Sequence, residues 1–285
     1  MGNVSILFSR FQSHGSAEKF NDILIVEPDG SGEVHITSNP APDGLLYDNA
    51  AGRFNSDRTK IAFLSTFNSP DNMYNVFIKS LVDGAVVQIT QSGDDFGDVD
   101  WSPDNSQLLV SAVDDNGMMQ LCLLDSGGTG MTQLTSGDSD CMGGRYSPAG
   151  DRIVFQKALF SGEQQIWMMD ADGTNQAQLP TGVDMVYAPN WSPDGEWVVF
   201  VSSSGQTSSH IKKINVTSGK VVSLTNPLPG CLDIVPVWAS SGIVFSSNRD
   251  LMGSGQVSNL YVMDGDGGNV RRITSNGQFD YPSDW

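Results

Sequence analysis

The chain has 285 residues, of which 39% are hydrophobic, and a formal net charge of −18. Nucleic acids and anionic membranes bind basic surfaces, so this charge argues against both as partners, whereas a cationic partner or a metal ion is compatible with it. No run approaches 18 apolar residues, so no membrane-spanning helix is predicted. Of the 33 acidic residues 28 are Asp. Because Asp caps local backbone amides in turns, we attribute most of the charge to turns.

The first predicted elements are three strands. Residues 6–9, 23–26 and 34–37 are rich in apolar side chains and match the second, third and fourth strands of a unit, and a long connection is expected from residue 10 to residue 22. No basic-then-apolar leader precedes the first strand. The sequence is therefore compatible with a cytoplasmic protein or with one whose leader was removed before residue 1.

An aromatic residue followed by a tight turn and a strand recurs along the rest of the chain. The fullest copy spans residues 190–200, where Trp191 precedes a Ser-Pro-Asp-Gly turn. The anchors recur in steps of 45 to 47 residues and are Phe54, Trp101, Tyr146, Trp191, Trp238 and Trp285. A period of this length with strands inside each unit is typical of a β-propeller.

Each unit contains three further strand-like segments after its anchor, so the sequence predicts an all-β fold of four-stranded antiparallel blades. In the fourth unit these segments are residues 153–156, 165–170 and 177–179. The first unit lacks an anchor strand, whereas the last anchor, in residues 278–285, lacks the remainder of a unit. Pairing the two ends closes a ring of six blades and removes two exposed strand edges.

The predicted domain organisation is a single propeller over residues 1–285. Its six blades are expected at residues 279–285 with 1–46, then 47–94, 95–139, 140–183, 184–231 and 232–278.

The connections divide into two classes. Turns after the anchor strand and after the third strand are short, whereas connections after the second and fourth strands are long and varied. In an antiparallel four-stranded blade the two long classes emerge on the same face, which we call the loop-rich face; the opposite side is the plain face. Varied loops on a uniform scaffold commonly carry function, so we expect the binding surface on the loop-rich face.

Several segments of the sequence resemble the repeat of the TolB-type propellers. They are residues 191–195, 246–250, 259–264 and 268–274. That family includes the periplasmic translocation protein of the Tol system and propeller domains of several peptidases and lyases. The resemblance covers all six units, although Asn55-Ser56-Asp57-Arg58 replaces the usual turn. It implies a six-bladed propeller and, for the Tol protein, protein binding in the cell envelope, hence a periplasmic or extracytoplasmic location. The Tol protein also carries a separate N-terminal domain, for which this sequence leaves no room.

A carboxylate precedes each anchor by five to seven residues, where the innermost strand of each blade is expected to begin. These residues are Asp48, Asp95, Asp140, Asp184, Asp233 and Asp280, and Asp98 adds a further acid. A ring of carboxylates at the channel mouth would attract a cation, a basic side chain or a metal such as calcium. The alternative is that each Asp caps its own loop or binds the backbone of a neighbouring blade.

Aromatic residues accompany these carboxylates, and they would either form an amphipathic rim or pack as core. They are Tyr47, Phe96, Tyr187 and Phe279. Arg10 and Arg249 occupy equivalent positions after the second strands of their units, and we expect salt bridges to nearby Asp residues.

Catalytic motifs are missing from the sequence. The three histidines fall in different units, which argues against a histidine metal cluster, and no Gly-x-Ser-x-Gly occurs. The Asp-x-Asp-Gly turns lack the later ligands of a calcium loop. Three cysteines without a CxxC spacing predict buried thiols.

The sequence therefore predicts a non-catalytic, monomeric binding propeller without a required cofactor. Its partner would be a protein or peptide of cationic character, bound at the loop-rich face and channel mouth. The alternative is a metal-dependent small-molecule enzyme, lactonase-like or lyase-like, that holds a divalent cation with channel carboxylates.

Overall fold

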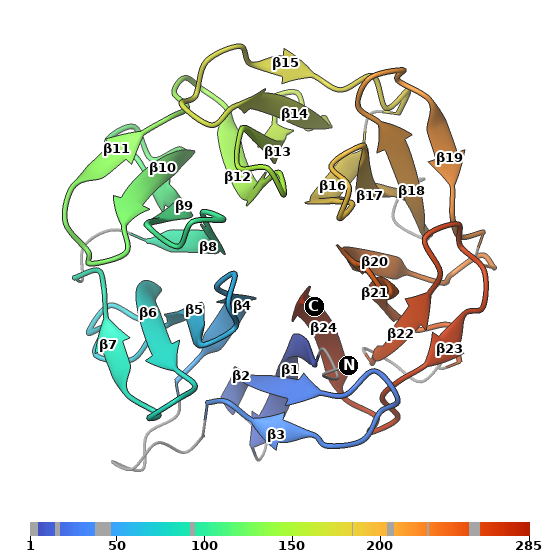
Figure 1. Ribbon diagram of the computed structural model, residues 1–285, viewed down its shortest axis with the longest axis horizontal. Helices are drawn as coiled ribbons and strands as arrows, with labels where there is room; N and C mark the ends of the chain where they lie inside the picture. The colour runs from blue at the N-terminus through green and yellow to red at the C-terminus, as the bar shows by residue number, and fades with distance from the viewer. Residues whose placement is uncertain are drawn as a thin grey trace.

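The computed structural model describes residues 5–14, 18–37, 47–91, 95–183, 185–203, 208–226, 228–250 and 257–285, with the backbone alone for 12–14, 18 and 19. Within these ranges the protein is built from twenty-four strands in six four-stranded sheets, arranged as blades around a central channel (Figure 1). The described residues contain no helix that could span a membrane. The predicted all-β, six-bladed propeller is confirmed.

Each blade has one inner strand at the channel and three strands further out. From the channel outwards, blade 1 has β24 (Phe279–Asp284), β1 (Ile6–His14), β2 (Glu18–Val26) and β3 (Val34–His35); blade 2 has β4 (Asn49–Phe54), β5 (Lys60–Ser65), β6 (Asn75–Ser80) and β7 (Val86–Gln88); blade 3 has β8 (Phe96–Trp101), β9 (Gln107–Val113), β10 (Met119–Asp125) and β11 (Met131–Gln133). Blade 4 has β12 (Asp140–Tyr146), β13 (Arg152–Ala158), β14 (Gln164–Asp170) and β15 (Ala177–Gln178); blade 5 has β16 (Val186–Trp191), β17 (Trp197–Ser203), β18 (Ser209–Asn215) and β19 (Val221–Ser223); blade 6 has β20 (Asp233–Ala239), β21 (Gly242–Ser247), β22 (Asn259–Met263) and β23 (Arg271–Arg272).

The ring is closed by the two ends of the chain. The last strand, β24, pairs antiparallel with the first, β1, from Phe11 opposite Phe279 to Leu7 opposite Asp284. Figure 1 shows these strands side by side in one blade. The predicted closure is confirmed, and it gives the inner strand of blade 1 the hydrogen-bonded partner that it would otherwise lack.

The predicted connection from residue 10 to residue 22 is wrong, because most of it is strand. β1 and β2 remain paired from Arg10 opposite Asp22 out to His14 opposite Glu18. The side chains over this extension are mostly polar, so the apolar alternation that marks a strand fades while the backbone ladder continues.

The hydrophobic core lies between adjacent blades in six clusters of buried side chains. Second strands contribute most to it, and all six residues of β21 are buried. The anchors are part of this scaffold: Trp101 and Trp191 are 6% and 4% exposed. Truncation of a buried Trp to Ala costs about 3–5 kcal/mol, so these two anchors each carry a substantial share of the stability.

Candidate functional site

Three of the predicted carboxylates bind the backbone of the preceding blade. Asp48 accepts the amide of Asn21 at 2.7 Å, and Asp140 accepts the amide of Met119 at 2.9 Å. Asp95 forms the equivalent bond at 3.2 Å. Each carboxylate therefore ties the start of one inner strand to the third strand of the blade before it. Asp184 lies outside the described residues.

Two other predicted carboxylates form ion pairs inside their own blades. Asp280 accepts Nε of Arg10 at 2.7 Å, and Asp233 accepts Nη2 of Arg249 at 2.9 Å. Both Asp side chains are fully buried. The expectation that the two arginines pair with local Asp residues is confirmed. Since a buried charge is stable only when it is paired, we assign these two carboxylates a structural role rather than one in binding a ligand.

Asp98 is the predicted carboxylate that faces the interior of the channel. It accepts Nη2 of Arg145 at 2.8 Å and lines a cavity of about 210 Å³. This cavity lies towards the loop-rich face, because residues from the early part of four inner strands surround it.

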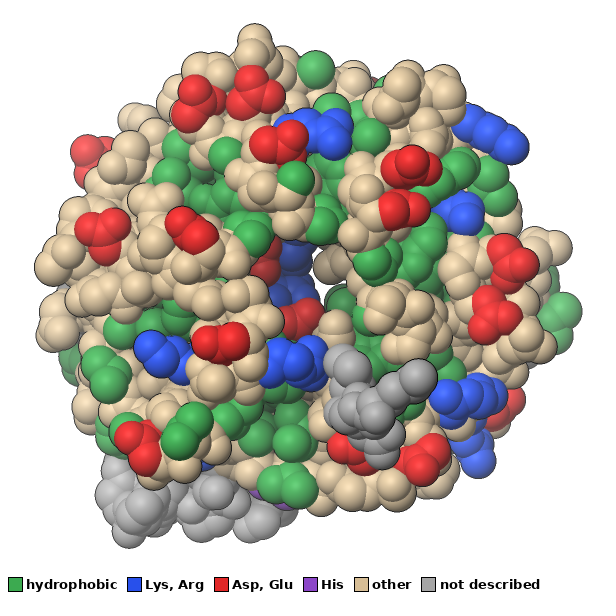
Figure 2. Space-filling model, in the orientation of Figure 1, with side chains coloured by type: hydrophobic (Ala, Val, Ile, Leu, Met, Phe, Trp, Pro, Cys, Tyr) green, Lys and Arg blue, Asp and Glu red, His purple; other side chains and the backbone are tan. Residues whose placement is uncertain are grey.

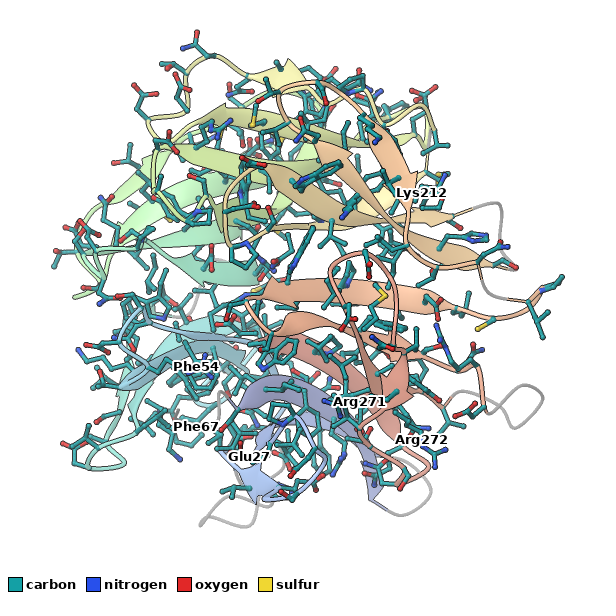
Figure 3. The ribbon with its side chains drawn as sticks, turned by 45° about the vertical axis from the view of Figure 1, so that its right-hand side comes forward. Glu27, Phe54, Phe67, Lys212, Arg271 and Arg272 are labelled. Carbon is teal, nitrogen blue, oxygen red and sulfur yellow. The ribbon has the colours of Figure 1, made fainter. Side chains whose placement is uncertain are left out.

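Of the four aromatic residues predicted at the rim, two pack against other side chains and two line cavities. Tyr47 packs edge-on against Phe67 at 4.9 Å between ring centroids, in blade 2 where Figure 3 labels Phe67, and Phe96 is 1% exposed in the core. Tyr187 lines the channel cavity. Phe279 lines a separate cavity of about 370 Å³ between blades 6 and 1.

A second ring of side chains, which the sequence reasoning missed, stands one residue before each anchor. In blade order its members are Asp284, Arg53, Asp100, Arg145, Asn190 and Val237. The first five line a cavity of about 410 Å³ at the plain-face mouth, together with the anchors and Ser-Pro turns. Viewed down the channel, basic and acidic side chains meet at the central opening (Figure 2).

In the odd-numbered blades the side chain of this ring accepts a hydrogen bond from a backbone amide of the next blade. Asp284 accepts the amide of Phe54 at 2.8 Å, and Asp100 accepts the amide of Tyr146 at 2.9 Å. Asn190 accepts the corresponding amide in blade 6 at 3.3 Å. Each acceptor therefore holds the anchor of the next, even-numbered blade.

The return contacts are made by indole groups. Trp101 donates Nε1–H to the carbonyl of Arg53 at 3.2 Å, and Trp191 donates to the carbonyl of Arg145 at 3.0 Å. In both cases an odd-numbered blade donates to the even-numbered blade before it. The sequence does contain a signal for this ring: acidic and basic residues alternate immediately before the anchors of blades 1 to 4.

Burial shifts the ionisation of this ring. It raises the pKa of Asp100 to about 6, against the opposing effect of Arg145 and then Arg53. It lowers the pKa of Arg53, and the positive charge of Arg145 lowers it further. Both shifts indicate that the channel stabilises its charges less well than water does.

The inner strands are strained where they face the channel. Their ladders shift register in all six blades, and Ala188 and Val235 adopt positive φ values of 52° and 50°. A left-handed conformation costs a β-branched residue about 1–3 kcal/mol. Since both residues line the channel cavity, the strained backbone shapes its wall.

Within the described part of the chain, no group of three or more His, Cys, Asp or Glu side chains is arranged to hold a metal ion. The divalent cation stays a prediction.

Among the described residues, four large apolar side chains are exposed on connections of the loop-rich face. They are Met73, Phe160, Met185 and Leu228, at 38%, 96%, 39% and 68% exposure. Exposed apolar side chains are available to pack against a partner, so these four are the candidate contact residues of the loop-rich face.

Comparison with known proteins places these features in context. The family model of the TolB beta propeller domain matches residues 6–283. No curated protein matches the chain. Similar solved structures include TolB from Acinetobacter baumannii, with 20% identity and a TM-score of 0.78 over 99% of this chain and 67% of that chain. Putative TolB from Agrobacterium tumefaciens has 20% identity and a TM-score of 0.74 over 96% and 98%.

An oligogalacturonate lyase in complex with manganese is also similar, with 14% identity and a TM-score of 0.58 over 95% of this chain and 74% of that chain. At such identities the likeness is one of fold, and propellers of one fold host unrelated functions.

Proposed function

The chain belongs to the TolB beta propeller domain family, and on this basis we propose that it is a non-catalytic binding propeller whose loop-rich face recognises a protein or peptide. The observation that carries the proposal is the exposure of Phe160 and Leu228 on that face. A few side chains that become fully buried against a partner contribute most of the energy of a protein interface.

The partner is proposed to be cationic. A net charge of −18 favours encounter with a positively charged surface and disfavours acidic ones. From the family resemblance we propose that the protein acts outside the cytoplasm, and we propose that it is a monomer.

The test compares variants on the two faces. Phe160→Ser and Leu228→Ser remove the apolar contacts of the loop-rich face, and Val82→Ser changes a residue that is 81% exposed on the plain face. Proteins retained from an envelope extract would be identified, purified and titrated against each variant. We expect the double variant to bind at least about tenfold more weakly, the scale of a lost hot spot, with Val82→Ser unchanged. Equal affinity for all three would contradict the proposal.

The second candidate is a metal-dependent enzyme. The likeness in fold to the manganese-bound lyase favours it, whereas the described residues offer no three-residue ligand cluster. We therefore propose binding as the function and test the metal separately.

A further inference from the structure

Arg53 is a buried cation in the channel, and its Nε has no acceptor among the residues that the structure describes. It stands at the end of β4, next to Phe54, whose place in blade 2 is labelled in Figure 3. The residue is 5% exposed and lines both channel cavities. Within the described chain its guanidinium forms no hydrogen bond or ion pair, and its Nε is a buried donor without an acceptor. Leaving a buried donor unsatisfied costs about 1–3 kcal/mol, and more when the group is charged.

The neighbouring charges already have partners. Arg145 donates to Asp98 at 2.8 Å and to the carbonyl of Gly144 at 2.7 Å. On the plain-face side, Asp284 accepts two backbone amides and Asp100 accepts one. Among the described residues, Arg53 is thus the charged member of the ring whose side chain forms no hydrogen bond or ion pair, although Asp284, Asp98 and Asp100 lie near enough to act on it electrostatically.

The charged residues that line the cavity towards the loop-rich face carry a net positive charge, although the protein as a whole is acidic. Its charged lining consists of two arginines and one aspartate, namely Arg53, Arg145 and Asp98. The wall opposite Arg53, from blades 5 and 6, is neutral and contains Ala188, Pro189, Val235, Pro236 and Val237. Its volume of about 210 Å³ suits a small group rather than a folded segment.

We propose that this cavity is a binding site for a carboxylate, held by the guanidinium of Arg53 with a short apolar or amide body against the neutral wall. A guanidinium forms two parallel hydrogen bonds with a carboxylate, and such charge-assisted pairs are the stronger hydrogen bonds of proteins. A doubly charged phosphate fits less well, because the two arginines and one aspartate of the lining leave one net positive charge to balance. The carboxylate belongs either to a free small acid or to the C-terminus of a peptide.

The test uses sodium propionate, with propionamide and sodium chloride at matched ionic strength as controls. Binding is followed by calorimetry and by the melting temperature of the whole protein. We expect propionate alone to bind and to raise the melting temperature. Arg53→Gln should bind it at least about tenfold more weakly, as expected for a lost charged hydrogen bond. Arg271→Gln, which removes an exposed charge on β23 (Figure 3), should bind it like the wild type.

A second variant keeps the proposal testable if Arg53→Gln does not fold. Asn190→Asp keeps an acceptor for the amide of Trp238 and adds a negative charge that lines the same cavity. It should fold and weaken propionate binding. Propionate that has no effect beyond chloride, or that binds both channel variants like the wild type, would overturn the site and would show that Arg53 only balances the buried acids.

A further pair of ligands, N-acetyl-dialanine and its C-terminal amide, distinguishes a peptide C-terminus from a free small acid as the source of the carboxylate. Tighter binding of N-acetyl-dialanine than of propionate indicates a peptide C-terminus, and tighter binding of propionate indicates a free acid. Neither result depends on Phe160 or Leu228, which do not line the cavity, so the site and the protein-binding proposal stand or fall separately.

Discussion

Nε of Arg10 lies 2.7 Å from Oδ1 of Asp280, so an ion pair joins the first and last strands of the chain. Their side chains are 6% and 0% exposed. The pair lies within the ladder that closes the ring, because Arg10 is directly opposite Asp280 in the register of β1 and β24. Charge pairing and strand pairing therefore support the same junction.

Asp280→Asn should strongly destabilise the protein. The change removes the charge that partners a buried guanidinium, and breaking a buried pair in this way costs about 3–5 kcal/mol. Asp250→Asn is the matched control, because the pair of Asp250 with Arg272 is half-exposed at 3.5 Å and such pairs contribute about 0–1 kcal/mol. Urea unfolding at neutral pH measures both free energies. Similar losses for the two variants would show that Arg10 is satisfied by Glu33 alone.

Deletion of residues 279–285 should abolish cooperative folding. It removes the whole inner strand of blade 1 and exposes the edge of β1. Trp285→Ala is the comparison, since it removes one anchor that is 8% exposed and leaves the β24 backbone in place. We expect a lower melting temperature for Trp285→Ala and no sharp transition for the deletion. A deletion variant that melts as sharply as the wild type would show that the ring does not need its closure.

Asp100→Asn should change the dependence of stability on pH. The pKa of Asp100 is raised to about 6 in the folded protein, whereas an unfolded Asp titrates at about 3.9. Its favourable contribution is therefore full below about pH 4 and is lost as the pH rises through about 6. Relative to the wild type, the variant should gain about 1–3 kcal/mol between about pH 4 and about pH 8. Unfolding curves across this range measure the gain, and a constant difference would contradict the assignment.

Asp104 should titrate in the opposite direction. Hydrogen bonds from Ser102 and then Ser106 lower the pKa of its carboxyl to about 2. Its contribution is present above about pH 4 and is lost as the pH falls through about 2. NMR titration of the Asp carboxyl signals should show the low value, and Ser102→Ala should return it towards the ordinary range. An unchanged pKa in that variant would assign the shift to other groups.

Metal analysis separates the two candidate functions. After dialysis we expect less than one divalent ion per chain, and a melting temperature that does not change when a chelator is added. One retained ion per chain, with melting that a chelator lowers, would favour the enzyme instead.

The fold was predictable because its signal is repeated. Every anchor follows the same period, so errors in one unit, such as the polar extension of β1, do not obscure the others. The starts of the inner strands were likewise visible, since Asp140 and Asp233 are the first residues of β12 and β20.

The channel chemistry was harder to predict. A sequence shows that Asp48 and Asp98 are acidic, but it does not show that one binds a backbone amide and the other an arginine in the channel. Those outcomes depend on how neighbouring blades are rotated, which is a property of the packed ring. The register shifts also turn the residue before each anchor towards the channel, and period-2 alternation does not reveal them.

The alternation of acceptor and donor blades around the channel means that single blades are not interchangeable parts. A blade that ends in an acceptor, such as Asp100 or Asn190, fits only before a blade whose anchor amide needs one. If one blade were moved by one place in the ring, two blades with acceptor side chains would become neighbours. The anchor amides of other blades would then lack a side-chain acceptor. Modular redesign of this propeller should therefore cut, duplicate or exchange blades two at a time, with the pair beginning at an odd-numbered blade.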